Sequence, residues 1–545
     1  MKTLRDSAGM RWTALLLLAL AMFCSYVFMD ILSPIKDLMQ ETRGWDSASF
    51  GRMQGAEVFL NVYVFFLIFA GIILDKMGVR FTAVLSGAVM LFGGLIKFYA
   101  CSEAFIGTSL ETWFTNNLNW NGELPIIGAI LPFAAGMPAS AKLAALGFMF
   151  FGCGCEMAGI TVSRGIVKWF KGRETALAMG SEMALARLGV ATCMIFSPYF
   201  AKLGGEIHVD NSVKFGVVLL CIALIMFITY FFMDKKLDSQ TGEAEEKDDP
   251  FKISDLGKIF TSLGFWLVAL LCVLYYSAIF PFQKYAVNML QCNLTLTPAD
   301  PTTYWGGSTE SFPIGVTWVQ YFLMLVVAAG SFSSNFIKNN KGLKFGLMGL
   351  AVVALVVYCY MGYMRGTAET IFAVFPLLAV AITPILGNYV DHKGKTATML
   401  LLGSLLLVIC HLTFAFVLPG VSAASPAGGV VVAYITILVL GASFSLVPAA
   451  LWPSVPKLVD EKIIGSAYAA IFWIQNIGLG LFPALIGIVL NKTNAEGTAA
   501  HELTYTWALV MLAALGIAAL LISIYLRAVD KKKGYGLEQP NIKAE

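Results

Sequence analysis

The chain has 545 residues, of which 58% are hydrophobic and only 13% are charged, and its formal net charge is +3. A soluble domain of this length could not bury so much apolar surface, so the composition argues against a soluble enzyme or a nucleic-acid-binding protein. Apolar runs of about 20 residues recur, which is the length of membrane-spanning helices and not of β-barrel strands. The ten cysteines show no metal-binding spacing, so no metal site is expected.

The apolar runs predict an all-α polytopic membrane protein with fourteen spans. The first run is longer than the apolar core of a signal peptide, so it is interpreted as a retained span. The predicted spans are residues 12–33, 53–74, 81–101, 143–163, 175–200, 213–233, 259–281, 317–337, 345–364, 368–388, 396–418, 430–451, 465–490 and 503–527.

An even number of spans places both termini on the same side of the membrane. Lys and Arg are concentrated in the two tails and in the short segments that would share their side. Because such residues are retained in the cytoplasm, both termini are expected to be cytoplasmic. The plasma (inner) membrane is expected rather than a lysosome-type membrane, since the N-terminal tail carries no acidic dileucine-type sorting sequence.

Two related segments, here named the signature segments, interrupt the apolar runs. The first is Gly71–Arg80, between the second and third spans, and a weaker copy is Gly387–Lys395 in the C-terminal half. A Gly-x-x-x-Asp-[Lys/Arg]-x-Gly-x-[Lys/Arg] pattern at this place resembles the loop between helices 2 and 3 of the major facilitator superfamily. The residues that carry it are Gly71, Asp75, Lys76, Gly78 and Arg80, with Asp391 in the second copy.

The resemblance implies the major facilitator fold, in which two six-helix bundles move solutes across a membrane by alternating access. In that superfamily this loop latches the bundles on the cytoplasmic side, so a gating role is expected for the signature segments. A carboxylate such as Asp75 can pair with a nearby cation. Arg164, at the inner end of the fourth span, is the candidate partner.

The second copy also bears on the domain boundaries. The charged segment 234–258 is interpreted as a cytoplasmic linker between an N-terminal bundle, 1–233, and a C-terminal bundle, 259–545. The second signature segment should follow the second helix of its half, but it follows the fourth. An inserted helical hairpin at 317–364 accounts for this and leaves the orientation of later spans unchanged.

Ionisable residues inside spans are expensive in lipid, so they point to functional positions. They are Asp30, Glu57, Glu156, Glu182 and Arg187. Glu156 and Arg187 lie at mid-depth on neighbouring spans, where a carboxylate and a guanidinium could hold the ammonium and the carboxylate of a zwitterion. A structural salt bridge between the two helices would explain the same two residues without any solute.

A closer resemblance runs through most of the core spans. The stretch Glu156–Glu174, continued at Ala186–Gly189, is similar to spans 4 and 5 of the lysosomal dipeptide transporter branch of the superfamily. Other core helices of that branch are similar to Tyr26–Asp30, Tyr275–Tyr276, Ala450–Ser454, Gly465–Tyr468 and Gln475–Leu479. In this branch the acid of helix 4 and the arginine of helix 5 hold the two ends of a dipeptide. The resemblance implies these roles for Glu156 and Arg187, in a bacterial-like member of the branch.

Further residues are candidates to surround the solute. Three aromatic residues in the resembling stretches could line a pocket or pack a core: Tyr276, Trp452 and Tyr468. Three amides could bond a substrate backbone or satisfy helix carbonyls freed by proline: Asn61, Gln475 and Asn476. Asp30 is a candidate supporting residue, and Glu57 and Glu182 are candidate protonation sites.

No phosphate-binding loop of the Gly-x-x-x-x-Gly-Lys-[Ser/Thr] type occurs, so ATP-driven transport is not supported and no cofactor is expected. The sequence therefore predicts a secondary transporter, not an enzyme, that moves a small zwitterion such as a dipeptide or short peptide. The expected partners are this solute and the lipid bilayer, with no nucleic acid; no residue points to a protein partner. The alternatives are a carrier for an organic anion or a sugar, or a non-transporting receptor or scaffold.

Overall fold

The regular structure of the chain is helical. The computed structural model describes residues 3–122, 131–171, 174–241, 259–294, 314–334, 340–365, 367–459 and 464–540, with the single residues 128, 257 and 337. In these ranges the only β-structure is an isolated bridge between Trp120 and Ala134. The predicted all-α class is confirmed.

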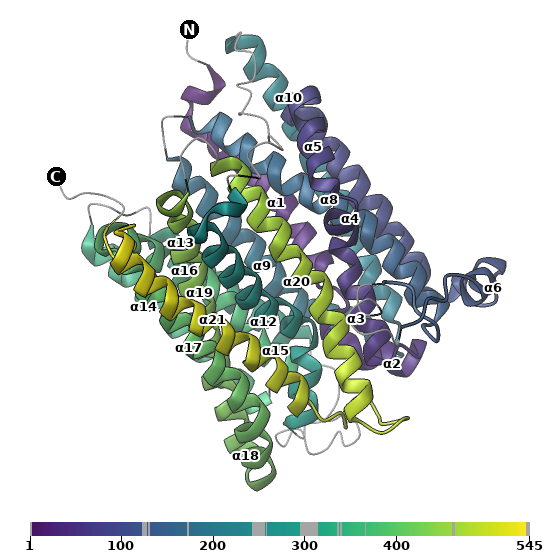
Figure 1. The fold of residues 1–545 in the computed structure, drawn as a ribbon. Coiled ribbons are helices and arrows are strands. Elements are labelled where there is room, and N and C mark those ends of the chain that lie inside the picture. Colours follow the sequence, from purple (N-terminus) through teal and green to yellow (C-terminus); the bar gives the residue numbers. More distant parts are fainter. Residues whose placement is uncertain are drawn as a thin grey trace. The chain divides into compact units, whose positions relative to one another are not determined.

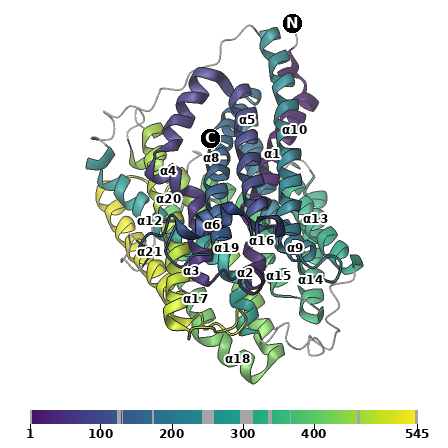
Figure 2. The ribbon, with the colours of Figure 1, turned by 90° about the vertical axis from the view of Figure 1, so that its right-hand side faces the viewer.

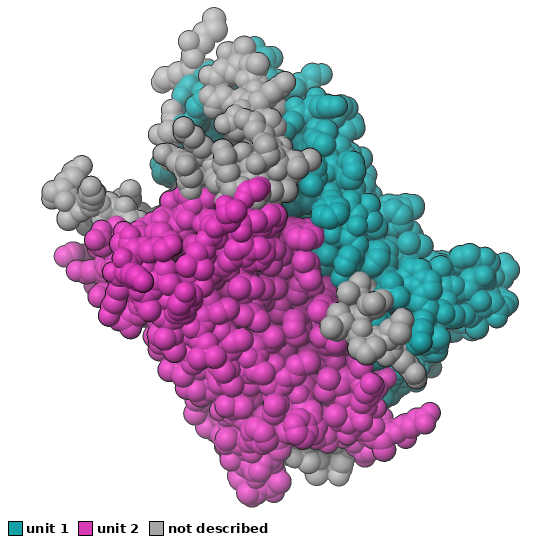
Figure 3. All heavy atoms as spheres, viewed as in Figure 1, with its two compact units in different colours: residues 1–250 teal, residues 251–545 magenta. Residues whose placement is uncertain are grey.

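The chain divides into two compact units, Met1–Pro250 and Phe251–Glu545, named unit 1 and unit 2 (Figure 3). The helices of unit 1 are η1 (Leu4–Asp6), α1 (Ala8–Met29), η2 (Ser33–Ile35), α2 (Lys36–Arg43), α3 (Ser47–Gly55), η3 (Ala56–Val58), α4 (Phe59–Tyr63), α5 (Phe66–Cys101), η4 (Glu103–Phe105), α6 (Ser109–Asn116), α8 (Ala139–Trp169), α9 (Thr175–Ala201) and α10 (Val209–Thr241) (Figure 1). Those of unit 2 are α12 (Leu263–Asn293), α13 (Ile314–Ser334), α14 (Lys341–Arg365), α15 (Ala368–Phe372), α16 (Val374–Lys393), α17 (Thr396–Leu412), the π-helix η5 (Thr413–Val417), α18 (Leu418–Ala424), α19 (Pro426–Leu458), α20 (Ile464–Thr493) and α21 (Thr506–Lys533).

Close packing in unit 1 depends on small residues. Helices α5 and α8 pack along much of their length, with α10 beside α5. A Cβ atom added at Gly147 of α8 would lie 2.7 Å from the carbonyl oxygen of Gly93 in α5. In a membrane, where burial of apolar side chains gives little gain over lipid, such backbone approach is a main source of helix association.

The number of spans differs from the sequence prediction. Within the described residues, twelve helices are long and apolar enough to cross a membrane, so the predicted fourteen is corrected to twelve. Predicted span 53–74 is not one helix: it is divided among α3, η3, α4 and the start of α5, with a break at Phe65, whose φ is 55°. The apolar part of α13, Trp318–Ser334, is shorter than the other spans.

The predicted hairpin region holds two adjacent helices. Helix α13 packs against α14 and α16, and both views show α13 beside α14 (Figures 1 and 2). One whole face of α14 is exposed, including Val352, Val356 and Tyr360. The opposite sides of these helices are buried, as at Met324 and Tyr358, and the bundle boundaries given by the sequence stay a prediction.

The segment predicted as a linker begins as a helix. Helix α10 continues to Thr241, so the first eight residues of 234–258 extend the last helix of unit 1. Residues 242–256 and 258 lie outside the described residues, as do Gly172 and Arg173 of the stretch that carries the closer resemblance.

Candidate functional site

The ionisable residues of α8 and α9 gather around one tyrosine of α1. Arg187 lies with its guanidinium carbon 5.8 Å from the centre of the Tyr26 ring. The hydroxyl of Tyr26 also interacts electrostatically with Glu156 and Glu182. All four side chains are half-buried. The structure thus brings one cation and two acids from α8 and α9 to a tyrosine of α1, within unit 1 alone.

The local sequence explains why α9 can reach Tyr26. A Cβ atom at Gly189 would lie 2.5 Å from the carbonyl oxygen of Phe23, so glycine lets α9 approach the backbone of α1. Arg187 is two residues before this crossing point and Tyr26 is three residues after it. Glu182 also interacts electrostatically with Arg187, although four residues separate them on α9.

Three other predicted residues of unit 1 lie in different settings. Asp30 caps the end of α1 and is 1% exposed, and its carboxylate accepts a hydrogen bond of 3.2 Å from Ser33 Oγ. The hydrogen bond from Ser33 therefore gives the buried Asp30 carboxylate a partner within the fold. Glu57 lies in η3, where its carbonyl closely approaches Gly152 of α8.

Asn61 is the clearest buried amide of unit 1. It lies in α4 and is 2% exposed, and neither its Oδ1 nor its Nδ2 has a hydrogen-bond partner among the described residues. An unsatisfied buried amide is costly, so this position favours contact with a water molecule or a solute.

In unit 2 the predicted aromatic residues form one cluster on α12, α19 and α20. Trp452 Nε1 donates a hydrogen bond of 3.1 Å to the Tyr276 hydroxyl, and the Tyr468 hydroxyl donates one of 2.9 Å to the Trp452 carbonyl. Phe472 stacks on Trp452 with a centroid distance of 4.7 Å. Phe472 is not among the predicted residues, although its spacing of four residues from Tyr468 places both on one helix face.

The predicted amides of unit 2 are buried near the same helices. Gln475 is 7% exposed and its Oε1 accepts a hydrogen bond of 3.2 Å from Cys272 Sγ in α12. Asn476 is 4% exposed. Gln475 therefore helps to join α20 to α12, and direct contact of either amide with a solute stays a prediction.

The first signature segment is mostly helical, not a loop. Gly71 and Lys76 lie in the first part of α5, which turns sharply at Gly78, where φ is 79° and ψ is 167°. Only glycine adopts this conformation at low cost, which explains its place in the pattern. Asp75 Oδ1 lies 2.7 Å from Arg164 Nη1, the partner suggested by the sequence. Both residues belong to unit 1, and their gating role stays a prediction.

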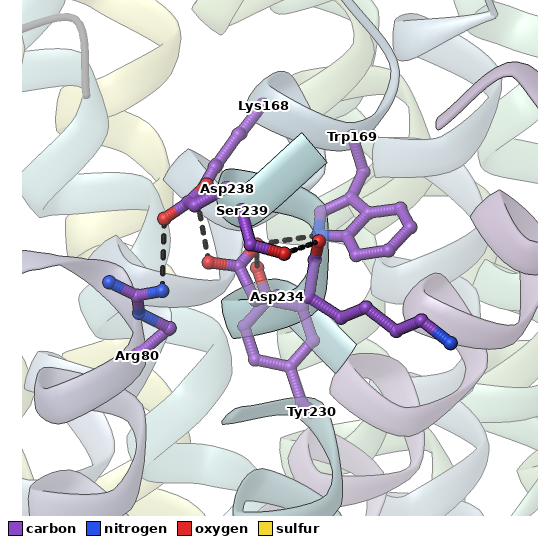
Figure 4. Close-up of polar contacts among 8 residues, drawn as sticks. Arg80, Lys168, Trp169, Tyr230, Asp234, Asp238 and Ser239 are labelled. Carbon is purple, nitrogen blue, oxygen red and sulfur yellow. Dashed lines mark hydrogen bonds and ion pairs between the residues drawn. The ribbon is translucent and has the colours of Figure 1, made fainter. Parts of the chain in front are cut away.

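A second set of ion pairs, missed by the sequence analysis, holds the other side of this turn (Figure 4). Arg80 Nη1 lies 3.0 Å from Asp238, and Lys168 Nζ lies 2.6 Å from Asp234 and 2.7 Å from Asp238. Trp169 Nε1 also donates a hydrogen bond of 2.8 Å to Asp234, whose side chain is fully buried. These acids belong to the extension of α10 that composition assigned to a solvated linker.

The second signature segment ends α16 and precedes α17. Asp391 lies in α16, and Lys457 at the end of α19 interacts electrostatically with Asp391 and Asp530. Gly394 has a φ of 72°. Gly78, at the corresponding turn of unit 1, also has a positive φ. Within the described ranges no cluster of three or more His, Cys, Asp or Glu side chains could hold a metal ion.

Comparison with known proteins agrees with this architecture. No family model matches the chain. It is 25% identical over 373 residues to the lysosomal dipeptide transporter MFSD1 of Bos taurus, which covers 67% of this chain and 62% of that protein. The Homo sapiens protein of the same name is 24% identical over 374 residues, 67% of this chain and 63% of that protein. The chain thus matches just under two thirds of these relatives' length.

Solved structures give the fold over nearly the whole chain. The nucleoside transporter NupG superposes with a TM-score of 0.57 at 11% identity, covering 94% of this chain and 99% of that one. A bacterial homologue of the human drug peptide transporters PepT1 and PepT2 also gives 0.57, at 12% identity over 96% and 99% of the two chains. The names of MFSD1 and NupG call each of them a transporter. The chain is therefore similar, at 24–25% identity, to the lysosomal dipeptide transporter MFSD1 over about two thirds of its length, and it has the fold of the solved structures named above.

Proposed function

We propose that the chain is a secondary transporter that carries a small zwitterion, with a dipeptide as the first candidate, by alternating access. The observation that carries the proposal is the group of Glu156, Glu182 and Arg187 around Tyr26. A guanidinium can bind a carboxylate through two parallel hydrogen bonds, and a carboxylate can bind an ammonium group. Arg187 would hold the carboxyl end of the solute and Glu156 the amino end.

The aromatic cluster of unit 2 offers, within that unit, a candidate contact surface for the side chain of a peptide. Tyr276, Trp452 and Phe472 offer flat apolar surface together with polar ring edges, which suits variable side chains. The distant MFSD1 relatives and the peptide-transporter homologue are named for peptides, which supports this solute class.

The fold itself does not select the solute. A D-xylose-proton symporter superposes with a TM-score of 0.52 at 12% identity, close to the values for the nucleoside and peptide transporters. An organic anion or a sugar therefore remains the alternative cargo. An organic anion would need Arg187 but not Glu156, so substitution of Glu156 distinguishes an organic anion from a zwitterion.

Uptake of a labelled dipeptide into proteoliposomes tests the proposal. Glu156→Gln and Arg187→Lys should each lower the uptake rate at least about tenfold, because the first removes the charge that would hold the ammonium group and the second replaces the two-point guanidinium contact with a single ammonium. Glu502→Gln is the matched control, since Glu502 is exposed after the end of α20 and should transport like the original protein. Full uptake by Glu156→Gln, or stabilisation of the purified protein by sugars and not by dipeptides, would contradict the peptide assignment.

Coupling to protons is a separate part of the proposal. Glu182 lies beside Arg187 and Glu57 lies on the broken second span, so both are candidates to bind the coupled proton. Uptake should rise when the outside is more acidic than the inside, and Glu182→Gln should remove this dependence. Uptake that ignores the gradient would exclude proton coupling and leave facilitated diffusion. We further propose a plasma (inner) membrane location with both termini cytoplasmic, which cysteine accessibility from each side can test.

A further inference from the structure

The C-terminal tail folds back on unit 2 after α21. Gly534 ends the helix with a φ of 71°, and its N–H donates a hydrogen bond to the Asp530 carbonyl. A second positive φ of 77° at Gly536 reverses the chain. The N–H of Leu537 then donates a hydrogen bond of 3.1 Å to Asp530 Oδ1. Two glycines and one acid thus turn the tail toward the end of unit 2 that carries the second signature segment.

The tail caps the beginning of α17. The N–H groups of Lys395 and Thr396 donate to the carbonyls of Glu538 and Leu537, at 3.2 Å and 3.1 Å. The N–H of Thr398 donates to Glu538 Oε1 at 2.8 Å, and the Thr398 hydroxyl donates to the same carboxylate at 2.9 Å. The first amides of a helix have no partner inside it, and a carboxylate there is favoured by the helix dipole.

A lysine of α19 holds the other side of the tail. Lys457 Nζ donates hydrogen bonds of 3.1 Å to the Gly536 carbonyl and 3.0 Å to the Gln539 carbonyl. Leu537, between these two contacts, is fully buried. The surface formed by Gly394–Thr398 and Lys457, named here the tail site, therefore receives a short peptide through its backbone, one apolar side chain and one carboxylate.

The energetics favour a contact that can open. The buried side chain of Leu537 and the hydrogen bonds of the tail stabilise the contact. The loss of backbone and side-chain freedom of the ordered segment opposes it and is of similar size. By contrast with the long helices, the tail should detach without unfolding unit 2.

We propose that the tail site is a peptide-binding site, that the chain's own segment Gly536–Gln539 is its releasable occupant, and that occupancy clamps α17 and α19 to the end of α21. The occupant is recognised as a glycine turn followed by an apolar residue and an acid. The proposal does not depend on the identity of the transported solute.

Hydrogen exchange of the full-length protein tests the site directly. The amides of Lys395, Thr396 and Thr398 depend on the tail for their partners, so their exchange reports its occupancy. Leu537→Asp should release the tail and speed their exchange at least tenfold, while exchange in unit 1 stays unchanged. Glu538→Gln should give a smaller increase at Thr398. Leu203→Asp, the same change at an exposed position between α9 and α10, is the matched control.

Competition then tests whether the occupant can be replaced. A synthetic peptide with the sequence of residues 531–540, added in excess to the Leu537→Asp protein, should restore slow exchange at these amides. The same peptide with aspartate in place of leucine should not. Unchanged exchange in Leu537→Asp would show that the tail does not protect α17. Failure of the original peptide to restore protection would show that the tail is a permanent part of the fold and cannot be replaced. Either result overturns the proposal.

Discussion

In unit 1 the signature segment is tied to the extension of α10 by ion pairs, whereas in unit 2 it is tied to the C-terminal tail by backbone hydrogen bonds and one buried leucine. Both segments turn at a glycine with positive φ, Gly78 and Gly394. Both receive acidic groups from the C-terminal part of their unit: Asp234 and Asp238 of the last helix in unit 1, and Glu538 of the tail after the last helix in unit 2.

The corresponding turns of the two units are therefore held by different kinds of interaction. The acids of unit 1 stand on a continuous helix and meet fixed cations, Arg80 and Lys168. The acid of unit 2 stands on a short reversed segment and caps a helix N-terminus. Unit 1 therefore has a fixed tie that is costly to break, and unit 2 has a tie that a small change in binding energy can release.

The largest expected effect breaks the fixed tie. Lys168→Met would leave the fully buried Asp234 carboxylate without its closest cation, since Lys168 Nζ lies 2.6 Å away. Removing one partner of a buried pair costs about 3–5 kcal/mol, so the midpoint of thermal unfolding in detergent should fall clearly. Lys76→Met is the matched control, because Lys76 is exposed on α5. Equal midpoints for the two variants would mean that the ion pairs of unit 1 do not hold the turn.

The contacts of the signature segment in unit 1 can be predicted in part from the sequence. Asp75 belongs to a local pattern, and Arg164 lies at the inner end of a neighbouring span, so their contact could be suggested without a structure. The sequence predicts a linker at Asp234 and Asp238, because their segment is rich in charge. Their spacing of four residues, directly after an apolar run, was the available sign of a continued helix face.

The tail site could not be predicted from the sequence. Leu537 is one apolar residue in a short glycine-containing segment, so no periodicity marks it as buried. Its partners lie about 140 residues earlier in the chain, so they come close to it only in the folded structure. The site of unit 1 is intermediate: charged residues in spans indicated Glu156 and Arg187, but only the approach of α9 at Gly189 placed them around Tyr26.

Two alanine substitutions compare the turns themselves. Gly78→Ala and Gly394→Ala each force a side chain into a positive-φ conformation, at a cost of about 1–3 kcal/mol. Gly394→Ala should also displace the tail, because its Cβ atom would lie 2.5 Å from the Glu538 carbonyl oxygen. Faster exchange at the start of α17 should therefore accompany this variant alone. Gly387→Ala, where nothing lies within 4 Å of the added Cβ atom, is the control. Fast exchange in Gly387→Ala as well would mean that the effect of Gly394→Ala does not come from displacement of the tail.

A smaller effect is expected at the pair that the sequence suggested. Asp75→Asn weakens the contact with Arg164. The side chain of Asp75 is 33% exposed and that of Arg164 is 17% exposed. Partly exposed ion pairs contribute about 1 kcal/mol or less, so the unfolding midpoint should fall less than in Lys168→Met. Lys76→Gln changes a neighbouring exposed charge and should have no effect. An Asp75→Asn loss as large as that of Lys168→Met would make Asp75, and not the α10 extension, the main tie of unit 1.

The smallest change tests how the tail is recognised. Thr398→Val removes the hydroxyl contact of 2.9 Å with Glu538 and keeps the backbone hydrogen bond of 2.8 Å to the same carboxylate. A loss of about 0.5–1 kcal/mol is expected, seen as slightly faster exchange at Thr396 and an unchanged unfolding midpoint. Thr229→Val removes a comparable hydroxyl from the exposed face of α10 and serves as the control. Because the tail contact is proposed to be near balance, even this loss should shift its occupancy measurably. Exchange identical to that of the original protein would mean that the backbone contacts and Leu537 alone hold the tail, and that the turn of unit 2 is fixed as firmly as that of unit 1.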